Sequence, residues 1–180
     1  DRPIYITANS RTKMYDGTPL RSDGFSWNIE LFDSLGINDK LYATIEGEIT
    51  NVGTVNNRIV SYRFVNAEGY EVTANYDRII CVDGELRITA RQVTFTSASD
   101  TKEYDGKPLT NADVEISGDG VVDYDKITFH VTGSQMDVGY SENAFTYEFA
   151  PDVDLNNYAV ETVFGELEVT RNTTPIDIKA

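Results

Sequence analysis

The chain has 180 residues, of which 40% are hydrophobic and 25% charged, and its formal net charge is −15 at pH 7. This composition is typical of a globular chain, and the acidic excess excludes the usual electrostatic basis for binding nucleic acid or anionic lipid. No apolar run approaches the roughly 18 residues of a membrane-spanning helix, so we expect no membrane insertion.

Short alternating segments dominate the first half of the chain. Residues 25–31 and 41–47 alternate apolar and polar side chains, as strands with one buried face do, and residues 85–89 repeat the pattern. Asp-Gly pairs between these segments predict turns. Only residues 32–36 are compatible with a helical turn, so the sequence predicts an all-β fold.

The second half of the chain repeats the first. The octapeptide at 13–20 recurs at 102–109, an offset of 89 residues, and the segment at 84–89 recurs at 165–170 with an offset of 81. The first copy therefore carries extra residues, with the largest surplus around 25–38. Self-similarity at such a period is the mark of a repeat architecture.

The repeat predicts the domain organisation. We expect one β module at residues 1–90 and a second at 91–172, with 173–180 as a linker or as the start of a truncated third repeat. Short strands separated by turn residues favour two tandem small β-sandwich modules of the immunoglobulin-like kind. A β-grasp-like sheet with one short helix is the alternative.

The ordered motifs resemble the YDG/MBG-type repeat of bacterial extracellular and cell-surface proteins. Each copy reads Lys-x-Tyr-Asp-Gly-x-Pro-Leu, then Asp-Lys before an alternating strand, then Val-Gly, Asn-Tyr, and a closing Gly-Glu-Leu. The resemblance covers nearly the whole chain. It implies an extracellular location, neighbouring repeat modules as partners, and no catalytic residues.

The resemblance implies a stalk that spaces or presents other domains. The first alternative is an adhesion module that contacts a host glycoprotein or glycan through loops that differ between the copies, chiefly 22–38 and 111–124. The second alternative is an accessory domain of a secreted hydrolase.

The repeated octapeptide is interpreted as a structural turn. Asp can accept a hydrogen bond from the backbone two residues on, Gly can adopt a positive φ, and Pro fixes the chain at a strand edge. Tyr can bury its ring, and Lys can cover that ring or bind a carboxylate. These roles are assigned to Lys13, Tyr15, Asp16, Gly17 and Pro19, and to Lys102, Tyr104, Asp105, Gly106 and Pro108.

The same lysines suggest a second hypothesis, an intramolecular Lys–Asn cross-link. Such a bond needs the two side chains together in an apolar core, where burial deprotonates the Lys. The candidate pairs are Lys13 with Asn57 or Asn75, and Lys102 with Asn143 or Asn157.

One acidic segment suggests calcium. Asp152, Asp154 and Asn156 place three oxygen ligands on alternate residues, as the start of an EF-hand loop does, but the Gly and bidentate Glu of that loop are missing. We expect a solvated acidic loop, with a calcium site as the alternative, and no other cofactor.

The remaining chemistry-bearing residues predict no enzyme. The single His130 lies in an alternating strand with no second His and no nearby Cys for a triad. Cys81 is the only cysteine, and we expect it to be a buried thiol in the core. Trp27, the only Trp, is also expected in the core.

Overall fold

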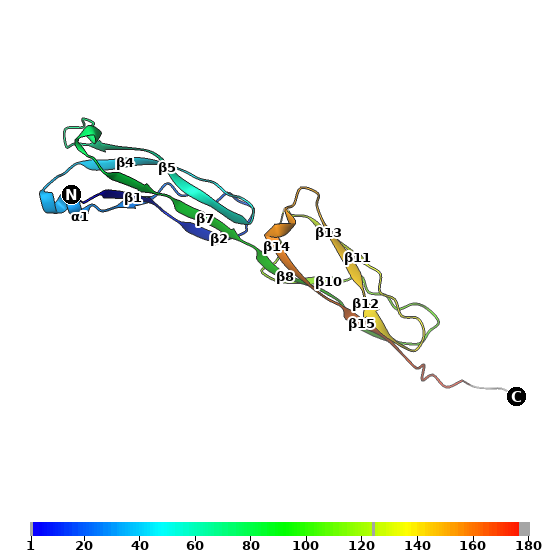
Figure 1. The fold of residues 1–180 in the computed structure, drawn as a ribbon. Coiled ribbons are helices and arrows are strands. Elements are labelled where there is room, and N and C mark those ends of the chain that lie inside the picture. Colours follow the sequence, from blue (N-terminus) through cyan, green and yellow to red (C-terminus); the bar gives the residue numbers. More distant parts are fainter. Residues whose placement is uncertain (1, 124, 177–180) are drawn as a thin grey trace. The chain divides into compact units, whose positions relative to one another are not determined.

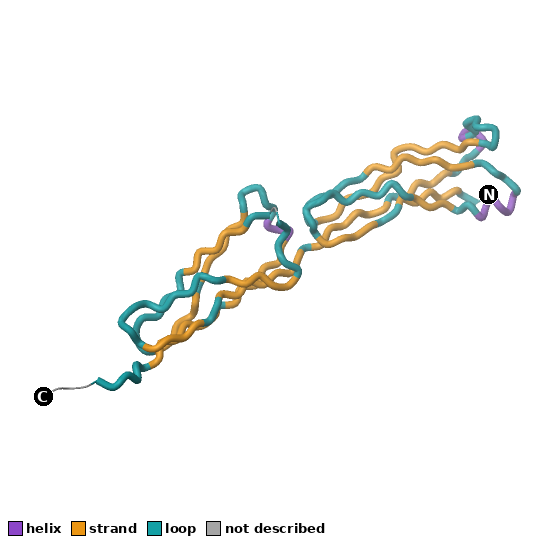
Figure 2. Tube along the Cα trace, turned by 180° about the vertical axis from the view of Figure 1, so that it is seen from behind, coloured by secondary structure: helices purple, strands orange, loops and turns teal. Residues whose placement is uncertain are grey.

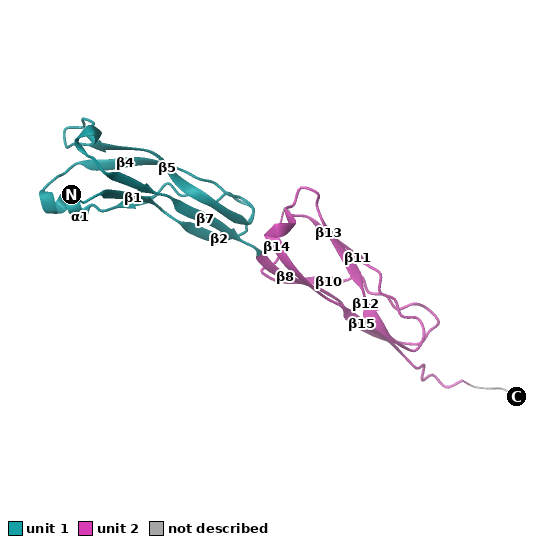
Figure 3. Ribbon diagram, in the orientation of Figure 1, with its two compact units in different colours: residues 1–90 teal, residues 91–180 magenta. Residues whose placement is uncertain are grey.

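The computed structural model describes residues 2–123 and 125–176, and the chain divides into two compact units, residues 1–90 and 91–180 (Figure 3). Strands contain 52% of the residues and helices 7%, so the prediction of an all-β chain is confirmed. Figure 2 shows how loops connect the strands at the ends of each unit. No helix among the described residues is long and apolar enough to cross a membrane.

The described part of the first unit contains seven strands, one short α-helix and one 3-10 turn (Figure 1). The strands are β1 (Ile4–Ala8), β2 (Arg11–Met14), β3 (Phe25–Trp27), β4 (Lys40–Glu46), β5 (Gly53–Val65), β6 (Ile79–Val82) and β7 (Gly84–Thr89). The helical elements are α1 (Glu30–Leu35) and η1 (Thr73–Asn75).

These strands form two sheets, with the orders β3-β1-β6 and β2-β7-β5-β4. Strand β1 pairs antiparallel with β3 and parallel with β6, while β2 pairs parallel with β7. From strand to strand the chain therefore changes sheet five times, and two of these changes, between β1 and β2 and between β6 and β7, are abrupt. Both changes occur within one or two residues.

Side chains from both sheets and from α1 form the core of the first unit. Ile4, Ile6, Phe32 and Phe64 are buried together, and partly buried Trp27 packs against them with its ring centroid 4.7 Å from that of Phe32. Trp27 is therefore in the core, as expected from the sequence. The aromatic rings pack in tilted and edge-to-face pairs, which is the preferred arrangement for aromatic groups in a core.

Helix α1 occupies the segment where the sequence allows a helical turn. It begins two residues earlier than predicted and ends at Gly36, whose φ of 68° lets its N–H donate to the carbonyls of Phe32 and Asp33. This is a glycine C-cap of the usual left-handed kind. The helix buries Phe32 in the core and lies at the same end of the unit as the N-terminus (Figure 1).

Within residues 91–123 and 125–176, the second unit contains eight strands and one 3-10 turn. The strands are β8 (Arg91–Ser97), β9 (Asp100–Glu103), β10 (Val114–Gly118), β11 (Ile127–Val131), β12 (Gly139–Asn143), β13 (Phe145–Phe149), β14 (Tyr158–Val163) and β15 (Gly165–Thr170). The 3-10 turn is η2 (Leu155–Asn157).

The second unit repeats the strand pairing of the first. Strand β8 pairs antiparallel with β10 and parallel with β14, and β9 pairs parallel with β15. Two strands of the second unit, β12 and β13, correspond to the single strand β5. Strand β12 pairs with β15 as β5 pairs with β7, and β13 pairs with β11 as β5 pairs with β4. The same sequence pattern thus produces the same connections in both units.

The registers of the two units also agree. Asn57 faces Gly84 in the first unit, and Asn143 faces Gly165 at the corresponding place in the second. In the first unit the register shifts between Thr44 and Ile45, where β5 carries an extra residue. The β11–β13 pairing has no such shift, so this β-bulge accounts for one step of the changing offset between the copies.

The core of the second unit centres on buried Phe95. Its ring lies 5.0 Å from those of Phe129 and Tyr147, and Phe149 stacks on Tyr158 at 4.8 Å. Beyond β15, residues 171–176 form no strand, and residues 177–180 of the proposed third repeat lie outside the described residues.

Candidate functional site

The Tyr-Asp-Gly segment of each unit is a turn closed by its own aspartate. Asp16 Oδ1 accepts from the Thr18 N–H at 2.9 Å, and Gly17 has a φ of 75°. In the second unit Asp105 Oδ1 accepts from the Lys107 N–H, also at 2.9 Å, and Gly106 has a φ of 73°. The positive φ explains why glycine stands at this position in both copies.

The lysine that precedes each turn binds it from the strand. Lys13 Nζ lies 2.6 Å from Asp16 Oδ1 and donates to the Thr18 carbonyl at 2.7 Å. Lys102 Nζ makes the equivalent bonds to Asp105 Oδ1 and the Lys107 carbonyl, at 2.8 and 2.6 Å. Each ammonium is thus held by the turn itself.

The remaining octapeptide residues differ in burial. Tyr15 is buried, whereas Tyr104 is 38% exposed, so the expectation of a buried ring holds only in the first unit. Pro19 and Pro108 precede Leu20 and Leu109, each of which forms an isolated antiparallel bridge. The prolines therefore lie where the chain enters a bridge.

The Asp16 turn predicts a pH dependence. The Lys13 ammonium and the Thr18 hydroxyl and N–H lower the pKa of Asp16 from 3.8 to about 2. A lowered pKa means that the stabilisation is fully present above pH 4 and is lost as the pH falls through about 2. Because this carboxylate is half exposed, we expect its contribution to be below about 1 kcal/mol.

Asp16→Asn should therefore flatten the loss of stability of the first unit between about pH 4 and pH 2. The measurement is the urea midpoint followed by the fluorescence of Trp27, which lies in that unit. Asp105→Asn, in the second unit, is the matched control and should leave the Trp27 transition unchanged. An unchanged acid dependence in Asp16→Asn would contradict the assignment.

A buried asparagine stabilises the change of sheet between β1 and β2 in the first unit. Asn57 is 0% exposed, and its Nδ2 donates to the carbonyls of Asn9 and Ser22, both at 2.9 Å. Asn9 lies between β1 and β2, and Ser22 lies in the loop before β3. One amide therefore ties β5 to two other segments.

The second unit has the same arrangement around Asn143. This residue is 0% exposed, and its Nδ2 donates to the carbonyls of Ala98 and Asn111, both at 2.9 Å. Ser97 adds a further link, since its Oγ donates to the Asn143 carbonyl at 2.6 Å and accepts from the Gly165 N–H at 3.0 Å. We call each of these arrangements an asparagine node.

Glycines permit the close approach of chain segments at the nodes. A Cβ at Gly84 would lie 2.3 Å from the Asn9 carbonyl oxygen, and one at Gly165 would lie 2.4 Å from that of Ala98. The Oδ1 atoms of Asn57 and Asn143 have no hydrogen-bond partner within the described part of the chain. The Asn57 Oδ1 instead faces Gly47, where a Cβ would come within 2.8 Å.

A tyrosine–aspartate bond is also repeated. The Tyr76 hydroxyl donates to Asp39 Oδ2, and the Tyr158 hydroxyl donates to Asp125 Oδ2 at 2.5 Å. Burial, together with the bond to Asp39, raises the pKa of Tyr76 well above its ordinary value. Tyr76 is thus a neutral hydrogen-bond donor that binds Asp39 immediately before β4.

The nodes and the tyrosine bonds were not identified from the sequence. A signal was present: Asn57 and Asn143 occupy the same place of the repeat inside strands, where asparagine is uncommon. The sequence does not show which backbone carbonyls these asparagines bind. Asn57 and Asn9 are 48 residues apart, and the pairing is visible only once the fold is known.

The calcium candidates lie at η2. Asp154 caps this turn, since its Oδ1 accepts from the N–H and Nδ2 of Asn156 at 3.0 Å, and Asp152 is exposed. Among the described residues no group of three or more His, Cys, Asp or Glu side chains is placed to hold a metal ion. The geometry therefore gives Asp154 a local role in the backbone turn.

In two of the candidate cross-link pairs, Lys13 with Asn57 and Lys102 with Asn143, the lysine and the asparagine lie in different networks. Lys13 binds Asp16 and Thr18, whereas Asn57 binds backbone carbonyls of other segments. Lys102 and Asn143 are separated in the same way. Each lysine instead forms an ion pair with the aspartate of its own turn, Lys13 with Asp16 and Lys102 with Asp105.

Cys81 is exposed, so the expectation of a buried core thiol was wrong. It lies in β6, at the edge of the β3-β1-β6 sheet, and the apolar run Ile79–Val82 that suggested burial belongs to this edge. His130 is exposed on β11, opposite Thr146. Among the residues that the structure describes, neither side chain forms a hydrogen bond or an ion pair with a second catalytic group.

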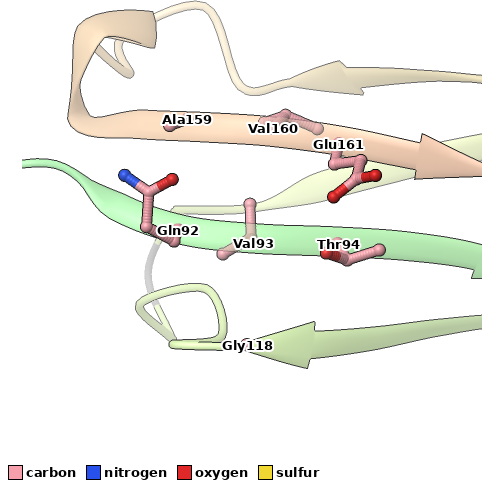
Figure 4. A pocket seen from close by; sticks show the side chains of 7 residues that line it. All are labelled: Gln92, Val93, Thr94, Gly118, Ala159, Val160 and Glu161. Carbon is pink, nitrogen blue, oxygen red and sulfur yellow. The ribbon is translucent and has the colours of Figure 1, made fainter.

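A shallow hollow on the second unit lies over the β8–β14 pair (Figure 4). Gln92 extends from β8 and Glu161 from β14, with Gly118 of β10 beside them. Glu161 is the single ionisable side chain of the lining. The hollow therefore lacks the paired groups that general acid–base chemistry requires.

Comparisons with family models, curated proteins and solved structures found no match to this chain. The resemblance to YDG/MBG-type repeats therefore rests on the motifs alone and stays a prediction.

Proposed function

We propose that this chain is a non-catalytic spacer of a secreted or wall-attached bacterial surface protein, built from two immunoglobulin-like sandwich modules of the YDG/MBG type. Its work is mechanical: it holds another domain away from the surface and resists extension. The single observation that carries this proposal is the parallel pairing of the second and last strands of each unit.

Parallel strands close to the two ends of a unit are loaded in shear when those ends are pulled apart. In the first unit β2 pairs parallel with β7, from Arg11 opposite Leu86 to Met14 opposite Thr89. The N-terminal end of β2 and the C-terminal end of β7 therefore lie at opposite ends of the pair. A pull on the two ends of the unit loads these hydrogen bonds together instead of opening them one by one.

The second unit has the same device in β9 and β15, from Asp100 opposite Leu167 to Glu103 opposite Thr170. The residues that both units share also support a structural role, because Lys13 Nζ, the Asp16 carboxylate and Asn57 Nδ2 all form bonds within the unit. A binding protein would instead leave shared polar groups available for a ligand.

Single-molecule stretching of the whole chain tests the proposal. We expect two abrupt unfolding events, each lengthening the chain by about 30 nm, because some ninety residues extend by roughly 3.3–3.6 Å apiece. Gradual extension without distinct force peaks would contradict a load-bearing role.

A pair of proline variants tests whether β2 carries the load. Tyr15 donates its N–H to the Thr89 carbonyl at 2.9 Å, and by the same alternation the Arg11 N–H faces β7 while the Thr12 N–H faces away. Arg11→Pro should therefore lower the unfolding force of the first unit, and Thr12→Pro should lower it less. Equal forces in the two variants would show that the load passes elsewhere.

A further inference from the structure

Strand β6 leaves part of its backbone without a strand partner. The Ile4 N–H donates to the Arg78 carbonyl at 3.1 Å, and Ile4 lies opposite Ile79. In a parallel ladder this register turns the backbone groups of Ile80 and Val82 toward β1. Those of Ile79 and Cys81 consequently point outward, and no strand of the described chain pairs with them.

The side chains of this edge are apolar and exposed. Ile80 and Val82 are each 40% exposed, Cys81 is exposed, and no charged residue lies within Ile79–Val82. Natural edge strands are normally protected by a charge, a proline or a bulge, because an unprotected edge pairs with other strands. Strand β6 has none of these protections.

The second unit supplies the comparison. Its strand β14 occupies the same place at the edge of the β10-β8-β14 sheet, and Glu161 stands where β6 has Ile80. The carboxylate of Glu161 interrupts the apolar run of that edge. The two units thus have the same fold but differ in whether this edge can accept another strand.

We propose that β6 pairs antiparallel with β6 of a second copy of this chain, about a two-fold axis at Cys81. Outward-facing residues must meet across such a pair, so Cys81 faces Cys81 of the copy and Ile80 faces Val82 of the copy. Each exposed apolar side chain then covers another, and the same residues serve both chains. The edge is therefore self-complementary, which favours a second copy over an unrelated peptide.

The single cysteine provides a direct readout of this register. Residues that exchange both hydrogen bonds in an antiparallel pair have Cα atoms about 5.5 Å apart, within the separation that a disulfide spans. Oxidation by an azo reagent such as diamide removes one hydrogen from each thiol, forms the S–S bond and reduces the reagent to the hydrazine. Any disulfide formed joins two chains, since the chain has one Cys.

Sedimentation velocity of the full chain with Cys81 reduced, across a concentration series, tests the pairing. We expect a reversible dimer, and Ile80→Glu should weaken it at least about tenfold because it introduces the charge found in the second unit. Tyr70→Glu, at a side chain that is 71% exposed elsewhere in the first unit, is the matched control and should dimerise as the wild type does.

Diamide cross-linking then locates the interface. Wild type and Tyr70→Glu should form the Cys81 disulfide rapidly, and Ile80→Glu slowly. Val82→Lys is a second edge variant, and Trp27 fluorescence verifies that each variant is folded. A wild type that stays monomeric, or a dimer that Ile80→Glu and Val82→Lys leave unchanged, overturns the proposal. Neither result bears on the spacer function, which stretching tests separately.

Discussion

Replacing Asn57 with Asp is expected to unfold the first unit while the second unit stays folded. The Asn57 Nδ2 donates to two backbone carbonyls and is fully buried. A carboxylate in its place offers no donor and turns negative charge toward both carbonyl oxygens. An uncompensated buried charge costs about 3–5 kcal/mol, a large share of the stability of a small domain.

Asn57→Ala separates the hydrogen bonds from the charge. Like Asn57→Asp, it removes the donor to the carbonyls of Asn9 and Ser22, but it adds no buried charge, and so it should destabilise the unit by less. Urea denaturation followed by Trp27 fluorescence reports the first unit, because Trp27 is the only tryptophan and packs in that core.

Asn143→Asp is the matched control in the second unit. It should leave the Trp27 transition where it is in the wild type and remove part of the far-ultraviolet circular dichroism in a separate, earlier transition. If Asn57→Asp and Asn143→Asp moved the Trp27 transition equally, the nodes would not be local to their units.

The parts of the fold that could be predicted are those with local chemistry. The strands were visible because one face of each is apolar, and the Tyr-Asp-Gly turn because Asp16 bonds to a residue two positions away. The asparagine nodes could not be predicted, because Asn57 and Ser22 are 35 residues apart. The two residues meet only because β5 runs beside the segment between β1 and β2 and the loop before β3 in the folded unit.

The prediction for Cys81 was wrong although it rested on a local pattern. The run Ile79–Val82 has the composition of a buried central strand, and composition alone cannot distinguish such a strand from an unprotected edge. The difference lies in the strand order β3-β1-β6, which puts β6 last. Only Glu161 in the second copy indicated that this position of the repeat can face solvent.

Gly84→Ala is expected to be the most damaging single-methyl change in the first unit. A Cβ at this position would lie 2.3 Å from the Asn9 carbonyl oxygen and 2.6 Å from that of Ala8. Both obstacles are backbone atoms at the change of sheet, and they cannot move without breaking the bond from Asn57. The cost should therefore exceed the upper end of ordinary overpacking, about 3 kcal/mol.

Gly69→Ala distinguishes this clash from the general cost of replacing a glycine. Gly69 has a φ of 88° and no atom within 4 Å of a Cβ, so the change costs only the strain of the left-handed conformation, about 1–2 kcal/mol. Gly165→Ala should reproduce the large effect in the second unit and leave the Trp27 transition unmoved. Gly84→Ala should be more damaging than Gly69→Ala if β7 packs against Asn9 as closely as the distances at Gly84 indicate. Equal destabilisation by the two variants would contradict this close packing and would leave the presence of glycine at both 84 and 165 unexplained.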